Sequence, residues 1–168
     1  TGGRIAMNYL TIPILLVALF LSPVAHADSH RSSMATDIAE GLAMIREGRF
    51  EIVRSELMMS ETEATEFWPK YTEYREEVDS VQDRYTDLVV EYVGRYENGD
   101  LSDDYADELI DSWFDIKREL LDIQEAYLAE FRKFLQALKV ARLFQLENKI
   151  NAEIDAQLAV VILLIDPR

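Results

Sequence analysis

The feature that most constrains this chain is a run of apolar and aromatic side chains spaced alternately three and four residues apart. This spacing places them all on one face of a helix and is the repeat of a coiled-coil seam. It continues for four heptads, through Ala64, Phe67, Tyr71, Tyr74, Val78, Val81, Tyr85, Leu88 and Tyr92. A helix of this length with one apolar face must bury that face against another helix or a partner.

The sequence also marks both ends of this helix. Ser60 and Glu63 have the spacing of a capping box, in which each side chain bonds a backbone N–H of the first turn. Asn98-Gly99 indicates the end, because glycine readily adopts the positive φ of a helix C-cap. We expect Pro69 to kink the first turns without shifting the phase of the seam.

A second seam with the same spacing follows an expected cap at Ser102. It consists of Ala106, Leu109, Trp113, Ile116, Leu120, Ile123 and Tyr127, and then slips by one residue to Phe131, Phe134 and Leu138. A further stripe recurs beside it every seven residues, at Phe114, Leu121, Leu128 and Leu135. An apolar face this wide needs a third helix or a binding partner.

The sequence therefore predicts an all-α fold, an elongated antiparallel helical hairpin with flanking shorter helices, assembled as a dimer. We expect the long helices at about 61–97 and 103–135, within a single domain spanning 28–168. A first helix is expected at about 36–58, after a loose segment that begins at Asp28. A closing helix is expected at about 138–157, followed by an apolar tail at 158–165 that needs cover.

The N-terminal segment has the pattern of a secretory signal peptide. Arg4 precedes an apolar run at 10–21, and Ala25-His26-Ala27 fits the cleavage site. We predict a signal peptide at 1–27 and a periplasmic protein with no stable membrane insertion after cleavage. A retained anchor is the alternative, but the run of about a dozen residues is shorter than the roughly 20 that span a bilayer.

The amino-acid composition excludes most kinds of catalytic site. The chain has no cysteine, and His30 is the only histidine after the expected cleavage site. A Ser-His-Asp triad and the Glu-x-x-His motifs of di-iron bundles are therefore missing. The acidic residues fall mostly off the seams, where we expect them in water rather than as acid–base pairs. The sequence predicts no catalytic, cofactor or metal site, so we expect that the protein is not an enzyme.

Charge narrows the choice of partner. The chain carries 32 acidic and 17 basic residues, with a formal net charge of −15, so nucleic acid is not an expected partner. The basic residues gather between Phe131 and Lys149, where they face only Glu147. These charges are either the solvated faces of two helices or an electrostatic pairing of the last helix with the hairpin or of two protomers.

Four apolar residues beside the seams are the candidate binding residues for a client or partner: Trp68, Phe114, Leu121 and Leu128. If exposed, they form an apolar strip larger than a monomer normally shows to water.

The chain resembles the periplasmic Spy/CpxP family of helical stress proteins and chaperones over about 57–154. The resemblance rests on two pairs of segments: Leu57-Met58-Met59-Ser60-Glu61 with Phe67-Trp68-Pro69, and 134–139 with 142–147. They occupy the places of the family's two Leu-Thr-x-x-Gln motifs, although neither motif is literally present and this chain is acidic where family members present a basic cradle. The resemblance implies an ATP-independent chaperone or stress protein that binds unfolded or envelope proteins. The alternative is an adaptor that docks a single envelope partner, such as a sensor domain.

Overall fold

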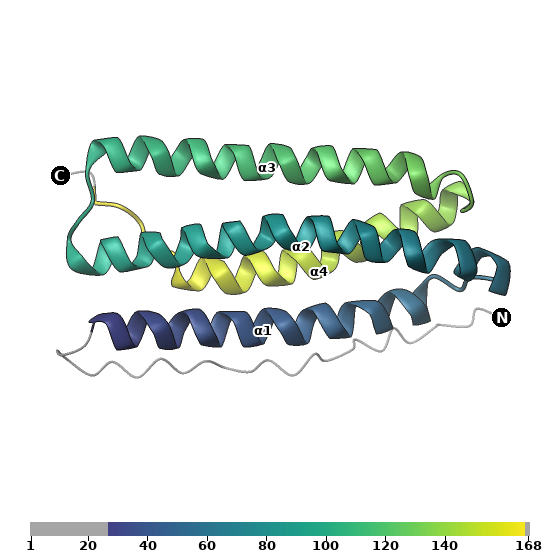
Figure 1. Cartoon of the computed structure of the whole chain (residues 1–168), viewed down its shortest axis with the longest axis horizontal. Coiled ribbons are helices and arrows are strands. Elements are labelled where there is room, and N and C mark those ends of the chain that lie inside the picture. The colour runs from purple at the N-terminus through teal and green to yellow at the C-terminus, as the bar shows by residue number, and fades with distance from the viewer. Residues whose placement is uncertain (1–26, 167–168) are drawn as a thin grey trace, which may run out of the picture.

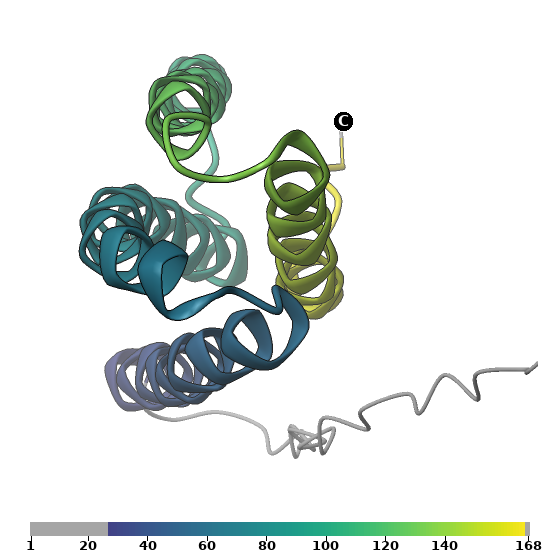
Figure 2. The ribbon, with the colours of Figure 1, turned by 90° about the vertical axis from the view of Figure 1, so that its right-hand side faces the viewer.

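The structure, a computed structural model, describes residues 27–166, which are all-helical and contain no strand. The helices are α1 (Ala27–Glu56), α2 (Glu61–Asn98), α3 (Asp103–Phe131) and α4 (Ala137–Val161). Successive helices run in opposite directions (Figure 1). Seen end-on, α2 and α4 lie between α3 and α1 (Figure 2). The signal peptide predicted at 1–27 lies outside the described residues, apart from Ala27.

Three predicted boundaries are corrected. The segment 28–35, expected to be loose, belongs to α1, which has 30 residues against 29 in α3 and is therefore not a short flanking helix. Nothing in that segment breaks a helix, since it contains neither glycine nor proline. α3 ends at Phe131 rather than near 135, because the chain turns there and buries Leu135 in the core. α4 runs on to Val161, beyond the expected end at 157.

The predicted caps are confirmed. The backbone N–H of Ser60 donates to Glu63 Oε2 at 2.8 Å, and the Ser60 hydroxyl accepts from the backbone N–H of Glu63. Lys139, at the start of α4, donates to the same carboxylate at 2.6 Å. The bonds from Lys139 and Ser60 lower the pKa of Glu63 to about 2. Gly99 ends α2 with a φ of 67°, and Ser102 caps α3.

All four helices meet in one aromatic core at the end of the molecule that holds the α1–α2 and α3–α4 turns. The core consists of Val53, Leu57, Phe67, Tyr71, Tyr74, Val78, Tyr127, Phe131, Leu135, Val140 and Leu143. Phe131 lies at its centre and contacts the rings of Phe67, Tyr74 and Tyr127 at centroid distances of 5.6 to 6.1 Å. The predicted α2 seam supplies much of this core, which confirms that the seam is buried.

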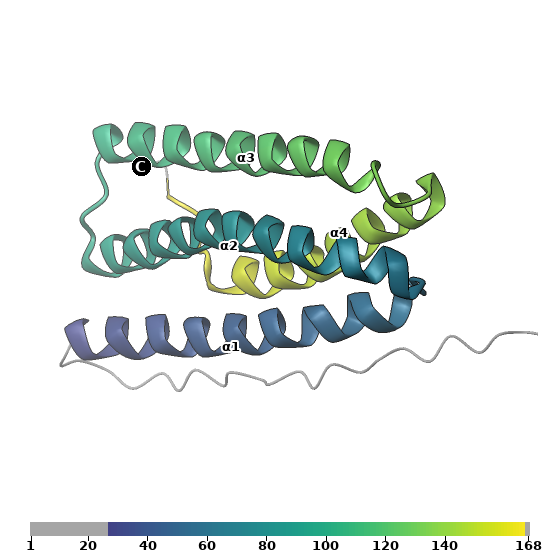
Figure 3. The same cartoon turned by 45° about the vertical axis from the view of Figure 1, so that its right-hand side comes forward.

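At the other end the helices separate into two pairs. Val89, Tyr92, Val93 and Tyr105 pack between α2 and α3, whereas Ile150, Ile154 and Leu158 of α4 pack against α1. Tyr85 contacts both clusters. α4 diverges from α3 toward α1 along its length (Figures 1 and 3). The side of α3 that faces α4 is therefore left without a helix over it at this end.

Candidate binding surface

The structure separates the four predicted binding residues into two groups. Phe114 and Leu121 are 48% and 54% exposed on α3. Trp68 and Leu128 are partly buried and pack against the aromatic core. The sequence left open whether these residues are exposed, and only Phe114 and Leu121 meet that condition for one exposed strip.

Trp68 belongs to the contact between α1 and α2. Its ring stacks on Phe50 at a centroid distance of 6.2 Å, and the Arg54 guanidinium lies 4.8 Å above it. Phe50 lies three residues before Val53, a spacing that places both side chains on one face of α1. That spacing was the signal that α1 covers this side of α2.

The outer surface of α3 divides into two flanks. Ile110, Phe114 and Leu121 are four and seven residues apart, so they share one face, and all three are exposed. We call this face the apolar flank. Asp115 and Asp122 each follow an apolar-flank residue by one position, and thus lie about 100° further round the helix, on what we call the acidic flank.

An apolar groove adjoins the apolar flank at the open end of the molecule. It has a volume of about 380 Å³ and is lined by Tyr85, Leu88, Val89 and Tyr92 of α2, by Leu109, Ile110 and Trp113 of α3, and by residues 162–165. Trp113 connects groove and flank, because its ring contacts Phe114 edge-on at a centroid distance of 4.8 Å. The Lys117 ammonium lies over the rings of Tyr85 and Trp113 and so marks one border.

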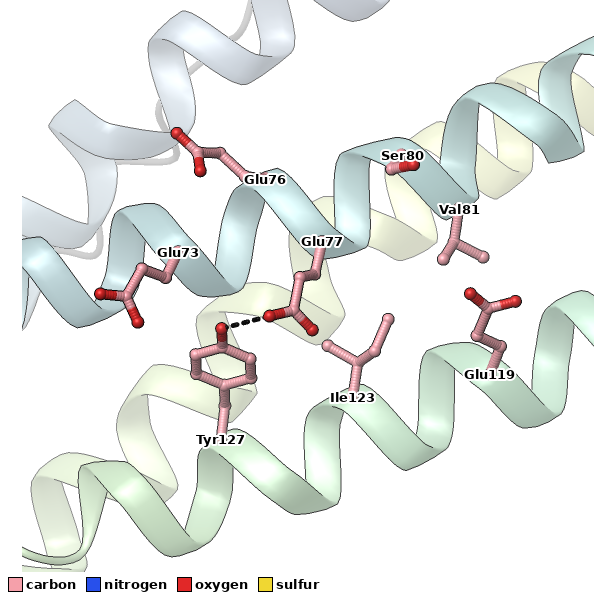
Figure 4. Close-up of a pocket in the computed structure, with 8 residues that line it drawn as sticks. All are labelled: Glu73, Glu76, Glu77, Ser80, Val81, Glu119, Ile123 and Tyr127. Carbon is pink, nitrogen blue, oxygen red and sulfur yellow. Dashed lines mark hydrogen bonds between the residues drawn. The ribbon is translucent and has the colours of Figure 1, made fainter.

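A second groove between α2 and α3 is acidic. It is lined by Glu73, Glu76, Glu77, Ser80, Val81, Glu119, Ile123 and Tyr127 (Figure 4). The Tyr127 hydroxyl donates to Glu77 at 2.6 Å, and burial together with this bond raises the pKa of Tyr127. Glu76 points away from α3 in this view, whereas Glu77 and Glu119 lie between the two helices (Figure 4).

A buried ion network holds α1, α2 and α4 together. Glu147 of α4 is 2% exposed, and accepts from Arg49 of α1 at 2.5 Å and from Arg75 of α2 at 2.9 Å. The Tyr71 hydroxyl donates to its other oxygen at 2.5 Å, and Arg75 also bonds Asp79. Burial alone would lower the pKa of Arg75, but Glu147 and Asp79 outweigh it and hold that pKa above its ordinary value.

Glu147 is an exception to the expectation that the acids lie mostly in water, because it is the one acid among the buried residues that the structure describes. Its signal in the sequence was that Glu147 is the single acid of a basic stretch. Other residues of that stretch also pair with the helices nearby, since Lys139 bonds Glu63 and Arg142 bonds Glu56. The basic segment is therefore partly an electrostatic contact of α4 with α1 and α2.

Among residues 27–166, no three His, Cys, Asp or Glu side chains are arranged to hold a metal ion. In the same range, no helix has an apolar stretch that is long enough to cross a membrane. No family model matches the chain, and neither a curated protein nor a solved structure matches it.

Proposed function

We propose that this protein is a non-enzymatic helical binding protein of the periplasm, which binds partly unfolded or envelope proteins through the apolar flank of α3. The observation that carries this proposal is the exposure of Ile110, Phe114 and Leu121 on one face. That face continues through Trp113 into an apolar groove. Contiguous apolar surface of this kind marks an interaction site.

The size of the flank favours weak and reversible binding. Each of its half-exposed side chains would contribute about 1 kcal/mol when a client covers it, at about 25 cal/mol per Å² of apolar surface. Three or four such contributions amount to a few kcal/mol. The loss of translational and rotational freedom on association reduces this gain, so the net binding is weak. Clients would therefore exchange without a nucleotide cycle, as the resemblance to ATP-independent chaperones implies.

The acidic flank has a complementary role in this proposal. The protein has a formal net charge of −15, so client complexes repel one another and stay dispersed. Asp115 and Asp122 lie next to the apolar flank, so a client with basic residues beside its apolar segment is favoured over an acidic one. We expect the binding of such clients to weaken as salt rises.

A second candidate function is that of an adaptor for one envelope partner, such as a sensor domain. The acidic groove favours it, since Glu73, Glu77 and Glu119 line it. Lys70 pairs with Glu73 and Arg84 with Glu119, so a basic surface would have to replace these ion pairs. A pull-down at low and high salt separates the two functions. One stoichiometric, salt-sensitive partner supports the adaptor, whereas many weakly held proteins support the general binding function.

Location and assembly are parts of the same proposal. Export to the periplasm is supported by Arg4, the apolar run at 10–21 and the small residues at 25–27. A homodimer is supported by the apolar side chains exposed around the end of α4, Val160 and Leu164, which a second copy would cover while leaving the apolar flank to clients. Sedimentation of the purified protein at several concentrations tests this dimer.

The proposed function predicts that the purified protein slows the aggregation of a heat-denatured model client. Replacing Phe114 and Leu121 together by serine is expected to remove most of this effect, because apolar contact area is lost from the flank. The matched control replaces two exposed acids of α1, Glu40 and Glu47, by serine and should retain the effect. Light scattering follows the aggregation, and a wild-type protein in several-fold excess that leaves it unchanged would show the proposed function to be wrong.

A further inference from the structure

The segment that follows α4 lies against the apolar groove. Ile162 has an extended backbone, with φ −83° and ψ 105°, and it packs against the cluster formed by α2 and α3. The Tyr92 hydroxyl donates to the backbone carbonyl of Leu163. This segment runs from the end of α4 toward the start of α3 (Figures 1 and 3). It therefore crosses the side of α3 that α4 leaves open.

The fit between segment and groove is incomplete. Leu163 and Ile165 are 48% and 44% exposed, and Leu164 is 89% exposed. The hydrogen bond from Tyr92 goes to a backbone carbonyl, which every polypeptide has. Residues 162–165 form one wall of the groove, so they cover the apolar surface of α2 and α3 only in part, and that surface is suited to extended apolar chain in general.

We propose that this groove binds an extended apolar segment of another polypeptide, and that residues 162–165 are an internal strap that competes for it. This inference rests on the proposed function, because it concerns the same apolar surface. It states which kind of client segment binds there and which element of the protein regulates access. The client segment has the chemistry of the strap itself, with aliphatic side chains and few charges. In the closed state the strap covers the groove, and a client must displace it.

The occupant is not the same segment of a second copy. The strap is tethered to the groove of the same molecule through α4, so its effective concentration at that groove is high. An identical segment from another molecule has the same contacts but lacks this advantage. A client segment that buries more side chains than the strap can displace it, and its apparent affinity is reduced by the fraction of molecules in which the groove is open.

Fluorescence anisotropy with a labelled peptide tests this proposal. The peptide carries the sequence of residues 158–165, with serines and glutamines added at both ends for solubility. A second peptide with aspartate at alternate positions serves as the negative probe. The proteins compared are the wild type, Ile162→Asp, Val160→Asp, and a variant that ends after Val161. Val160→Asp is the matched control, because it introduces the same charge two positions away, on a side chain of α4 that is 80% exposed and does not line the groove.

If residues 162–165 compete with the peptide for the groove, Ile162→Asp and the shortened variant should bind the apolar peptide about tenfold more tightly than the wild type. This difference corresponds to about 1.4 kcal/mol. Val160→Asp should bind it as the wild type does, and the aspartate-containing peptide should bind to none of the four proteins. Equal affinity of all four proteins, or no binding to any, would overturn the strap. Association of the shortened variant into larger species on addition of wild-type protein would point to a second copy and would overturn it as well.

The same four proteins separate this proposal from the proposed function. If Ile162→Asp gains peptide affinity and no variant slows client aggregation, the strap stands and the chaperone function fails. If the wild type slows aggregation and Ile162→Asp neither binds the peptide more tightly nor slows aggregation further, the chaperone function stands and the strap fails.

Discussion

Replacing Glu147 by alanine is expected to destabilise the protein by about 3–5 kcal/mol, because it leaves the Arg49 and Arg75 guanidinium groups buried without their shared carboxylate. The loss would be a large part of the total stability of a small domain, which is about 5–15 kcal/mol. Glu153→Ala, an exposed position on the same helix, is the control and should change the stability by less than about 1 kcal/mol. Urea denaturation followed by circular dichroism measures both.

A triple variant shows where this energy comes from. This variant replaces Arg49 and Arg75 by methionine and Glu147 by leucine. It therefore removes all three formal charges from the buried group that these residues form. Because an apolar replacement of a whole buried ion network is often neutral or stabilising, we expect it to recover most of the loss. A triple variant that is as unstable as Glu147→Ala would show that packing around the network, and not an unpaired charge, causes the effect.

Phe131→Ala is expected to cost about 3–5 kcal/mol, since Phe131 is fully buried at the centre of the aromatic core. Phe114→Ala removes the same atoms from a half-exposed position on the same helix and should cost about 1 kcal/mol or less. Thermal unfolding of the two variants is the measurement. Similar losses at both positions would contradict the division of α3 into a core-facing side and an exposed apolar flank.

The sequence predicted best what depends on local spacing. The heptad pattern identified the buried seam of α2, and the capping residues placed its two ends at Ser60 and Gly99, because these signals lie within a few residues of each other. The start of α1 was missed for the opposite reason. Polar residues without glycine or proline allow either a helix or a loose segment, and no local signal decides between them.

The candidate site depended on contacts between distant parts of the chain. Trp68 and Phe114 were both identified as apolar residues beside a seam, but only Trp68 has a partner in α1, where Phe50 stacks on it. Glu147 is buried because it meets arginines that lie 72 and 98 residues away in the sequence. A periodic pattern within one helix cannot show which other helix covers it.

The binding role of the apolar flank can be tested by site-specific cross-linking. The chain has no cysteine, so a single cysteine carrying a photoreactive label can be placed at Leu121 or at the adjacent Asp122. The two positions differ by about 100° around α3 and lie on opposite flanks. With a heat-denatured client present, we expect cross-links from position 121 and few from position 122. Equal yields from both, or none from position 121, would contradict the assignment of the apolar flank as the binding surface.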